Sequence, residues 1–268
     1  MLLKNTLLNY SVEENSVALM TFIYNNTPIN FNIPSISFRS NAPVYTPRLV
    51  PSKDGFATNP LYDNFGSKAQ IEATIKSNPR IQEILNEYHI PAKVNMNELE
   101  NLKKGHLQDT RVISAQIYSS LPNEMKKEVS LPHLQEAAML HDYGKVLIPD
   151  NVLNKVSRLD NQEREIMNLH SELGYELLKD KGLSENTLNL IKYHHQTPNG
   201  NGYPVINNSF EYGIDAQILA TADKYAALTE KRSYKDAMSK EQALAIIHED
   251  VEKGLISQEV FDALAKAV

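Results

Sequence analysis

The chain contains no cysteine and no tryptophan among its 268 residues. Without cysteine it can form neither a disulfide nor a thiolate metal site, so any metal must be bound by His, Asp, Glu or water. A cysteine-free chain also fits a reducing compartment. No run of about 18 apolar residues occurs, which argues against a membrane-spanning helix, and the first residues lack the features of a signal peptide. We therefore expect a cytoplasmic protein.

Positive charge is also scarce relative to negative charge. The chain has 27 Lys and Arg against 33 Asp and Glu, for a formal net charge of −6. A protein that binds polynucleotides is usually basic, so a polynucleotide groove is not expected. A small anionic ligand such as a nucleotide needs only a few local cations and stays compatible with this balance. Apolar residues make up 41% and charged residues 22%, as is ordinary for a globular protein.

The N-terminal quarter differs in composition from the rest of the chain. Residues 17–24 are largely apolar and precede a polar turn at residues 25–28, which predicts a hairpin. Residues 34–66 hold several prolines with Ser, Asn and Gly between them, a composition typical of an extended linker. We predict an irregular, Pro-rich extension over residues 1–66, of unassigned function, followed by a helical domain over residues 67–268.

Helical signals dominate from Lys68 onward. Apolar residues recur at helical spacing, and Pro79 is expected to separate two short helices. Capping boxes are predicted at Asp160 and Ser239, each with a Glu or Gln three residues later, and Gly254 is a predicted helix stop. No strand alternation is evident. The fold class is therefore predicted to be all-α, a helical bundle whose core face carries polar side chains.

Imidazoles and carboxylates follow several of these apolar helices. A single His on an apolar face is usually a satisfied core residue. A carboxylate after a run as apolar as residues 218–222, by contrast, is costly to bury unless a cation meets it. The side chains in question are His141 and Asp142, His170, His194 and His195, and Asp223. Together they predict that separate helices surround a pair of divalent metal ions, a centre that can activate water and bind a phosphate at once.

Four stretches carry a family resemblance: HDYGKVLIPDNVLNK (141–155), HSELGYELL (170–178), YHHQTPNGNGYP (193–204) and ADKYAALTEKRSYK (222–235). They resemble the HD superfamily of metal-dependent phosphohydrolases, and within it the bacterial HD-GYP group, over about residues 104–237. The resemblance implies an all-α HD-type bundle around a binuclear site with two divalent ions, most often iron or manganese. It also implies hydrolysis of a cyclic dinucleotide, chiefly cyclic di-GMP, by two-metal activation of water. A homodimer is compatible with it.

The same resemblance assigns roles to individual residues. His141, Asp142 and Asp223 would hold the first metal, and Asp142, His170, His194 and His195 the second. Asp142 and Lys145 are the expected catalytic pair. The expected substrate contacts are Gly202, Tyr203, Pro204, Arg232 and Lys235. Two of these assignments have alternatives: Tyr203 either stacks on a base or packs its loop, and Arg232 and Lys235 either hold the phosphate or form a solvated charged turn.

The first ligand of the family, a His some thirty residues before His141, has two possible counterparts. Alignment on Arg111 and Val112 with the fewest gaps places Gln108 there, which is a poor ligand. His106 requires a slightly longer loop, but it shares a helical stripe with Thr110, Ile113, Ser114, Ile117 and Leu121, the face expected to point inward. We predict that His106 is the ligand.

Three further positions depart from the family pattern. Gln196, Asn199 and Ala226 stand where the family usually has an acidic residue. These changes affect the prediction of which substrate is bound more than the prediction of metal binding. The alternatives are therefore an HD-type enzyme for another nucleotide or phosphoester, a non-catalytic sensor of a cyclic dinucleotide, and a helical scaffold with buried polar residues.

Overall fold

The computed structural model describes residues 67–230 and 237–268. The predicted hairpin and linker of residues 1–66 and the predicted phosphate contacts Arg232 and Lys235 lie outside the described residues. None of the described helices combines the length and the apolar composition needed to cross a membrane.

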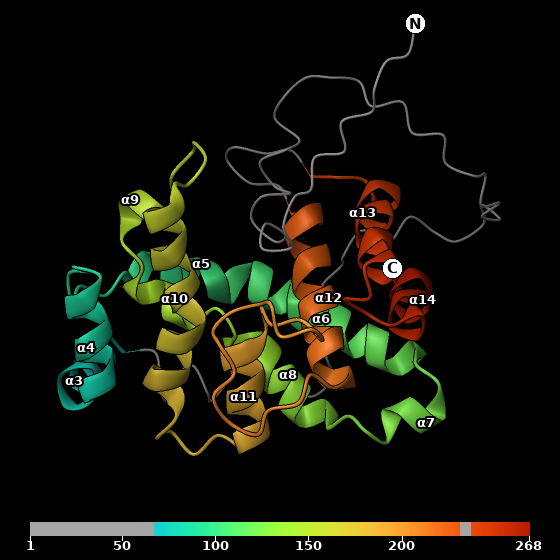
Figure 1. Ribbon diagram of the computed structural model, residues 1–268, viewed down its shortest axis with the longest axis horizontal. Helices are drawn as coiled ribbons and strands as arrows, with labels where there is room; N and C mark the ends of the chain where they lie inside the picture. The colour runs from blue at the N-terminus through green and yellow to red at the C-terminus, as the bar shows by residue number, and fades with distance from the viewer. Residues whose placement is uncertain (1–66, 231–236) are drawn as a thin grey trace, which may run out of the picture. The chain divides into compact units, whose positions relative to one another are not determined.

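Every regular element in the described part of the chain is a helix, which confirms the predicted all-α class (Figure 1). Between residues 203 and 195 there is an isolated β-bridge, which belongs to a loop. The elements are α3 (Lys68–Ser77), α4 (Pro79–Glu87), α5 (Met96–Lys104), α6 (His106–Ser120), α7 (Asn123–Lys126), α8 (Leu131–Leu140), the 3-10 helix η2 (Tyr143–Leu147), α9 (Asp150–Leu153), α10 (Asn161–Leu178), α11 (Glu185–Tyr193), α12 (Ile214–Thr229), α13 (Lys240–Glu252) and α14 (Gln258–Ala267).

Helix boundaries follow the local signals of the sequence. Pro79 is the first residue of α4, where its missing N–H costs nothing, and it separates α4 from α3 as predicted. The predicted capping boxes at Asp160 and Ser239 both form, at the starts of α10 and α13. Gly254 follows α13 with φ 69°, so the predicted helix stop is confirmed.

Two groups of helices meet at the centre of the described domain. In the first, α6 packs against α8, α12 and α14; in the second, α10 packs against η2 and α11. Figure 1 shows α10, α11 and α12 in a row with α6 and α8 crossing behind them. Fully buried side chains such as Leu107, Ile117 and Leu134 fill the space between these helices. Polar side chains at the same depth therefore need a specific partner.

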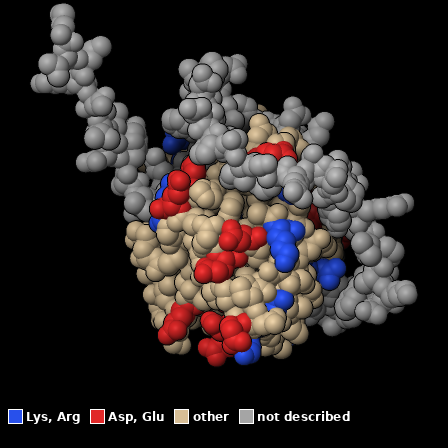
Figure 2. Space-filling view, turned by 90° about the vertical axis from the view of Figure 1, so that its right-hand side faces the viewer, with Lys and Arg blue, Asp and Glu red and all other residues tan. Residues whose placement is uncertain are grey.

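One face of the described residues carries charges of both signs (Figure 2). On the face drawn in Figure 2, basic side chains of the described residues are scattered among acidic ones. The described residues of this face therefore offer no broad basic surface to a phosphate-bearing ligand.

Candidate metal centre

All seven predicted metal ligands lie together in the structure. They form three overlapping groups in which the donor atoms lie within 4.8 Å of one another: His106, His141 and Asp223; His141, Asp142 and His194; and His170, His194 and His195. The donor side chains come from five places in the fold: α6, the α8–η2 junction, α10, the end of α11, and α12. The cluster therefore depends on how these helices pack together.

The turn between α8 and η2 brings Asp142 close to α10. His141 ends α8, and the N–H of Lys145 donates to the carbonyl of Asp142 at 2.9 Å as the chain enters η2. Gly144 allows η2 to lie directly on α10, because a Cβ at this position would be 1.9 Å from the carbonyl oxygen of His170. That close approach leaves Oδ1 of Asp142 3.4 Å from Nε2 of His170.

Three of the histidines are oriented in the same way. In each, Nδ1 is within hydrogen-bond distance of the backbone carbonyl three residues earlier on its own helix. The pairs are His141 with Ala138 at 3.0 Å, His170 with Met167 at 2.7 Å, and His194 with Ile191 at 2.8 Å. A carbonyl can only accept, so Nδ1 carries the proton in each pair. The lone pair of the neutral ring is then on Nε2, the tautomer that binds a metal.

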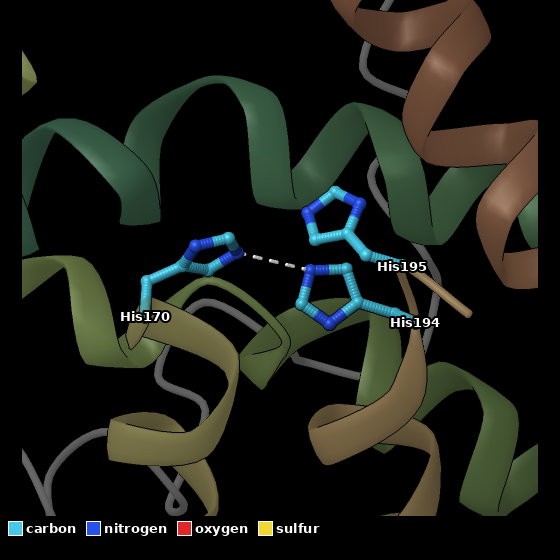
Figure 3. A group of neighbouring side chains, drawn as sticks. All are labelled: His170, His194 and His195. Atoms are coloured by element: carbon cyan, nitrogen blue, oxygen red, sulfur yellow. Dashed lines mark hydrogen bonds between the residues drawn. The ribbon is translucent and has the colours of Figure 1, made fainter. Parts of the chain in front are cut away.

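The Nε2 atoms face one another without a proton to share. Nε2 of His170 lies 3.2 Å from Nε2 of His194 (Figure 3). Because both rings already donate through Nδ1, this contact brings two lone pairs together in the neutral state. Nε2 of His141 is buried and has no hydrogen-bond partner. Imidazole nitrogens in this arrangement suit divalent cations, which would satisfy these lone pairs.

Asp142 lies between the two halves of the cluster. Its Oδ1 faces His170, whereas its Oδ2 lies 2.7 Å from Nζ of Lys145, 3.5 Å from Nε2 of His141 and 3.8 Å from Nε2 of His106. One carboxylate therefore offers an oxygen to each half. This is the position from which a single side chain can bridge two cations.

Asp223 belongs to one half only. Its Oδ1 lies 2.7 Å from Nε2 of His106 and 3.5 Å from Nε2 of His141. Burial opposes the charge of both aspartates, but Lys145 and the imidazoles hold the pKa of Asp142 well below its usual value, and His106 and His141 do the same for the pKa of Asp223. Both carboxylates are consequently ionised.

The other half of the cluster is rich in neutral imidazole. Burial lowers the pKa of His170 to about 4 and the pKa of His195 to about 3, and burial also brings the pKa of His194 well below its usual value. These rings are unprotonated near neutral pH, as metal ligation requires. For His141, burial lowers the pKa, but Asp142 and Asp223 outweigh it and raise the pKa overall.

His106 and Gln108 were the two possible counterparts of the family's first ligand, and the start of α6 bears on which of them can reach the cluster. The helix begins at His106, immediately after Gly105, and this places the His106 ring in the cluster beside Asp223. Gln108 lies two residues further on, about 200° around the helix axis. The geometry favours the His106 alignment frame.

The loop that contains Gly202, Tyr203 and Pro204 folds over the paired histidines. The Tyr203 ring lies 4.7 Å from the His195 ring at an interplanar angle of 31°, and 6.3 Å from the His170 ring. Of the two roles considered for Tyr203, the packing contact is therefore present in the structure.

Two residues near the site were not among the predicted site residues: Gln196, which was expected only as the loss of a negative charge, and Glu230. Gln196 is 2% exposed and bonds to two backbone groups of this loop. Glu230 places Oε2 4.0 Å from Nδ1 of His106. An amide next to two histidines was the available signal for Gln196, whereas no local pattern indicated Glu230.

A helical bundle that gathers buried His and Asp side chains in this way is typical of metal-dependent phosphohydrolases. The model of the HD domain family matches residues 93–260. The chain therefore belongs to the HD domain family, and the predicted resemblance to the HD superfamily is confirmed.

Named relatives match shorter parts of the chain. A 3'3'-cGAMP-specific phosphodiesterase 2 of Vibrio cholerae is 40% identical over 111 residues, which cover 41% of this chain and 21% of the relative. The cyclic di-GMP phosphodiesterase response regulator RpfG of Xanthomonas campestris is 36% identical, with 43% and 31% covered. A cyclic di-GMP phosphodiesterase of Thermotoga maritima is 35% identical over 141 residues, with 52% and 38% covered. The matched parts thus amount to well under half the length of each relative.

Proposed function

We propose that this chain is a metal-dependent phosphodiesterase of the HD-GYP type that hydrolyses a cyclic dinucleotide, with cyclic di-GMP as the first substrate to test. The observation that carries the proposal is the convergence of seven donor side chains with Asp142 between two halves. The names of the relatives support the substrate class, because they include phosphodiesterases for cyclic di-GMP and for 3'3'-cGAMP.

The seven donor side chains would form two cation positions. His106, His141 and Asp223 would hold one divalent ion, His170, His194 and His195 the other, and Asp142 would contact both. Iron or manganese suits this mixture of imidazole and carboxylate donors. When bound, such a pair supplies an activated water and stabilises the negative charge that develops on a phosphate.

Lys145 gives the site its own cation. Its Nζ lies 2.7 Å from Oδ2 of Asp142, and the side chain is 21% exposed. We infer that it orients the carboxylate and offers positive charge to a non-bridging oxygen of the substrate phosphate. Arg232 and Lys235 remain predicted phosphate contacts, three residues apart in sequence.

A metal analysis joined to a turnover assay tests this function. The protein is loaded anaerobically with Fe²⁺ or Mn²⁺, and its metal content is measured. Hydrolysis is then followed with cyclic di-GMP, 3'3'-cGAMP, a linear dinucleotide and a panel of nucleoside monophosphates. We expect about two ions per chain and turnover of at least one cyclic dinucleotide. Absence of stoichiometric metal, binding of a cyclic dinucleotide without turnover, or turnover confined to the other phosphoesters would each contradict the proposal.

Low pH should destabilise the metal-free protein, because histidines in the metal centre are held unprotonated in the folded state. In the folded state the pKa of His170 is about 4 and that of His195 about 3, against about 6.5 in an unfolded chain. Below pH 6.5 the unfolded chain therefore takes up protons that the folded protein does not. The free energy of unfolding should fall as the pH falls, by about 1.4 kcal/mol per pH unit for each ring. The raised pKa of His141 acts in the opposite direction but in a different window: its contribution grows as the pH falls from above 6.5 to 6.5 and is constant below that.

Urea unfolding in EDTA at pH 7.5 and pH 5 measures this loss. We expect a lower midpoint at pH 5, with a smaller pH difference in a His170→Gln variant, because it lacks one of the three rings with a lowered pKa, His170, His194 and His195. Equal midpoints at the two pH values would show that these rings are not buried in the neutral form.

A further inference from the structure

His195 is partly buried, and its ring is held differently from those of the buried histidines of the cluster. His141, His170 and His194 each donate from Nδ1 to a helix carbonyl. Within the described residues, neither ring nitrogen of His195 makes a hydrogen bond. Its ring instead contacts other rings: Tyr203 at 4.7 Å and 31°, and His194 at 4.0 Å and 45° between centroids and planes. Ring packing rather than a hydrogen bond therefore sets its orientation.

The backbone on both sides of Tyr203 is fixed by one buried amide. Nε2 of Gln196 donates to the carbonyl of Pro204 at 2.6 Å, and Oε1 of Gln196 accepts from the N–H of Gly202 at 3.1 Å. The N–H of Tyr203 donates to the carbonyl of His195 at 3.3 Å. The loop is thus bonded to the chain segment that carries the ring it covers.

Gly202 makes this close contact sterically possible. A Cβ at Gly202 would lie 2.2 Å from the carbonyl oxygen of His195 and 2.5 Å from Cα of Gln196. Since real side chains do not approach so closely, any larger residue would push the loop and the Tyr203 ring away from His195.

The two hydrogen bonds that Gln196 makes with Gly202 and Pro204 require an amide side chain. An ionised Glu at position 196 could accept from the N–H of Gly202 but could not donate to the carbonyl of Pro204, because a carboxylate has no proton. The chain has Gln at this position, and both ends of the side chain are bonded. Each interaction of Tyr203 described above uses its ring or its backbone, so its phenol oxygen is not needed for the contact.

We propose that Gln196, Gly202 and Tyr203 form a positioning device for His195. Gln196 clamps the loop, and the Tyr203 ring holds the imidazole in the orientation in which it joins His170 and His194. Figure 3 shows these three rings converging from α10 and the end of α11. The inference rests on the proposed function, because it assigns the device to one of the two cation positions. The ion at the His170 half depends on it, whereas the ion at the Asp223 half does not.

Binding of Mn²⁺ to the metal-free full chain tests the device without relying on activity. The variants are Gln196→Ala, Tyr203→Ala and Tyr203→Phe. Phe210→Ala is a matched control, because Phe210 is an aromatic residue of the same loop that stacks on Tyr193 and not on His195. We expect Gln196→Ala and Tyr203→Ala to weaken one of the two Mn²⁺ dissociation constants by about 10- to 100-fold and to leave the other within about twofold. Tyr203→Phe and Phe210→Ala should keep both.

Kinetics separate this role from a platform for a substrate base. If Tyr203 acts through the metal, excess Mn²⁺ should restore kcat in Tyr203→Ala, and KM for the cyclic dinucleotide should change little. A raised KM that excess Mn²⁺ does not lower would overturn the inference in favour of base stacking. Thermal unfolding of the metal-free variants checks that they are folded, and Gln196→Ala carries the test where Tyr203→Ala is unstable.

Failure of the inference and failure of the proposed function give different results. Wild-type protein that binds two Mn²⁺ ions, together with alanine variants that bind both equally well, would overturn the positioning role alone. Wild-type protein that binds no Mn²⁺ would overturn the proposed function and the positioning role with it. If wild-type protein binds Mn²⁺ but hydrolyses no cyclic dinucleotide, only the proposed activity is lost, because the affinity measurements still decide the role of Tyr203.

Discussion

An Asp142→Asn variant should lose at least about 10³-fold in kcat/KM, equivalent to roughly 4 kcal/mol of transition-state stabilisation. The substitution keeps the shape of the side chain but removes its charge and replaces one of two oxygens with an NH₂ group. In the structure both oxygens are used: Oδ1 faces His170, and Oδ2 faces His141 and Lys145. Asparagine cannot serve both halves as an anionic bridge. The variant should therefore lose metal as well as activity, and bind fewer than two ions per chain.

Asp262→Asn is the matched control for this change. Asp262 is an exposed carboxylate on α14, where it accepts a hydrogen bond from Gln258 at 2.7 Å. The same chemical change there should leave kcat/KM and metal content within about twofold, because surface substitutions rarely matter. The measurements are metal analysis by mass spectrometry and steady-state hydrolysis of the substrate identified for the wild type.

Thermal unfolding in EDTA shows whether the Asp142 variant is folded. The metal-free variant lacks the ion pair between position 142 and Lys145, so some loss of stability is expected, and the variant is compared with the wild type at a temperature at which both are folded. If Asp142→Asn retains both ions and nearly full turnover, Asp142 does not bridge the two halves. The proposed division of ligands would then be wrong.

The fold could largely be predicted from the sequence because most of its determinants are local. The capping boxes at Asp160 and Ser239 and the break at Pro79 depend on residues at most three positions apart, and all of them form. Apolar periodicity then indicates which face of each helix is buried. The order of packing, with α6 between α8, α12 and α14, depends on contacts distant in sequence and was not predicted.

For the candidate site, too, local features could be predicted and contacts between distant residues could not. Six of the seven donors could be proposed because His and Asp on or after apolar helices are costly to bury unless a cation meets them. The seventh, His106, was proposed from the family resemblance and helical phase. For the first ligand, the alignment with the fewest gaps gave Gln108 and helical phase gave His106; the structure places His106 at the start of α6, beside Asp223. The contact of Gln196 with Gly202 and Pro204 depends on a loop conformation that no periodic pattern encodes.

Gly144→Ala should be among the most damaging single substitutions in the described domain. A Cβ at Gly144 would lie 1.9 Å from the carbonyl oxygen of His170 and 2.5 Å from the backbone nitrogen of Gly174. Both neighbours are backbone atoms of α10, so a rotamer change cannot relieve the clash, and η2 must move away from the helix. We expect a loss of roughly 3–5 kcal/mol in the free energy of unfolding, which is large for a single methyl group.

Gly182→Ala separates this clash from the ordinary cost of replacing a glycine. Gly182 has φ 82°, and a Cβ there would meet no atom within 4 Å. Its replacement should cost about 1–2 kcal/mol, through left-handed backbone strain alone. Urea unfolding of the two metal-free variants beside the wild type compares the two costs directly.

The same movement should reach the metal centre. Asp142 lies two residues before Gly144, and its Oδ1 is 3.4 Å from Nε2 of His170 across the contact that the methyl group would open. Mn²⁺ should therefore raise the unfolding temperature of the wild type and of Gly182→Ala, because a ligand that binds only the folded state stabilises it. It should raise that of Gly144→Ala much less. If Gly144→Ala unfolds near the wild-type midpoint and keeps the full Mn²⁺ response, η2 can shift without separating Asp142 from His170. In that case the close packing of η2 on α10 is not what positions the bridging carboxylate.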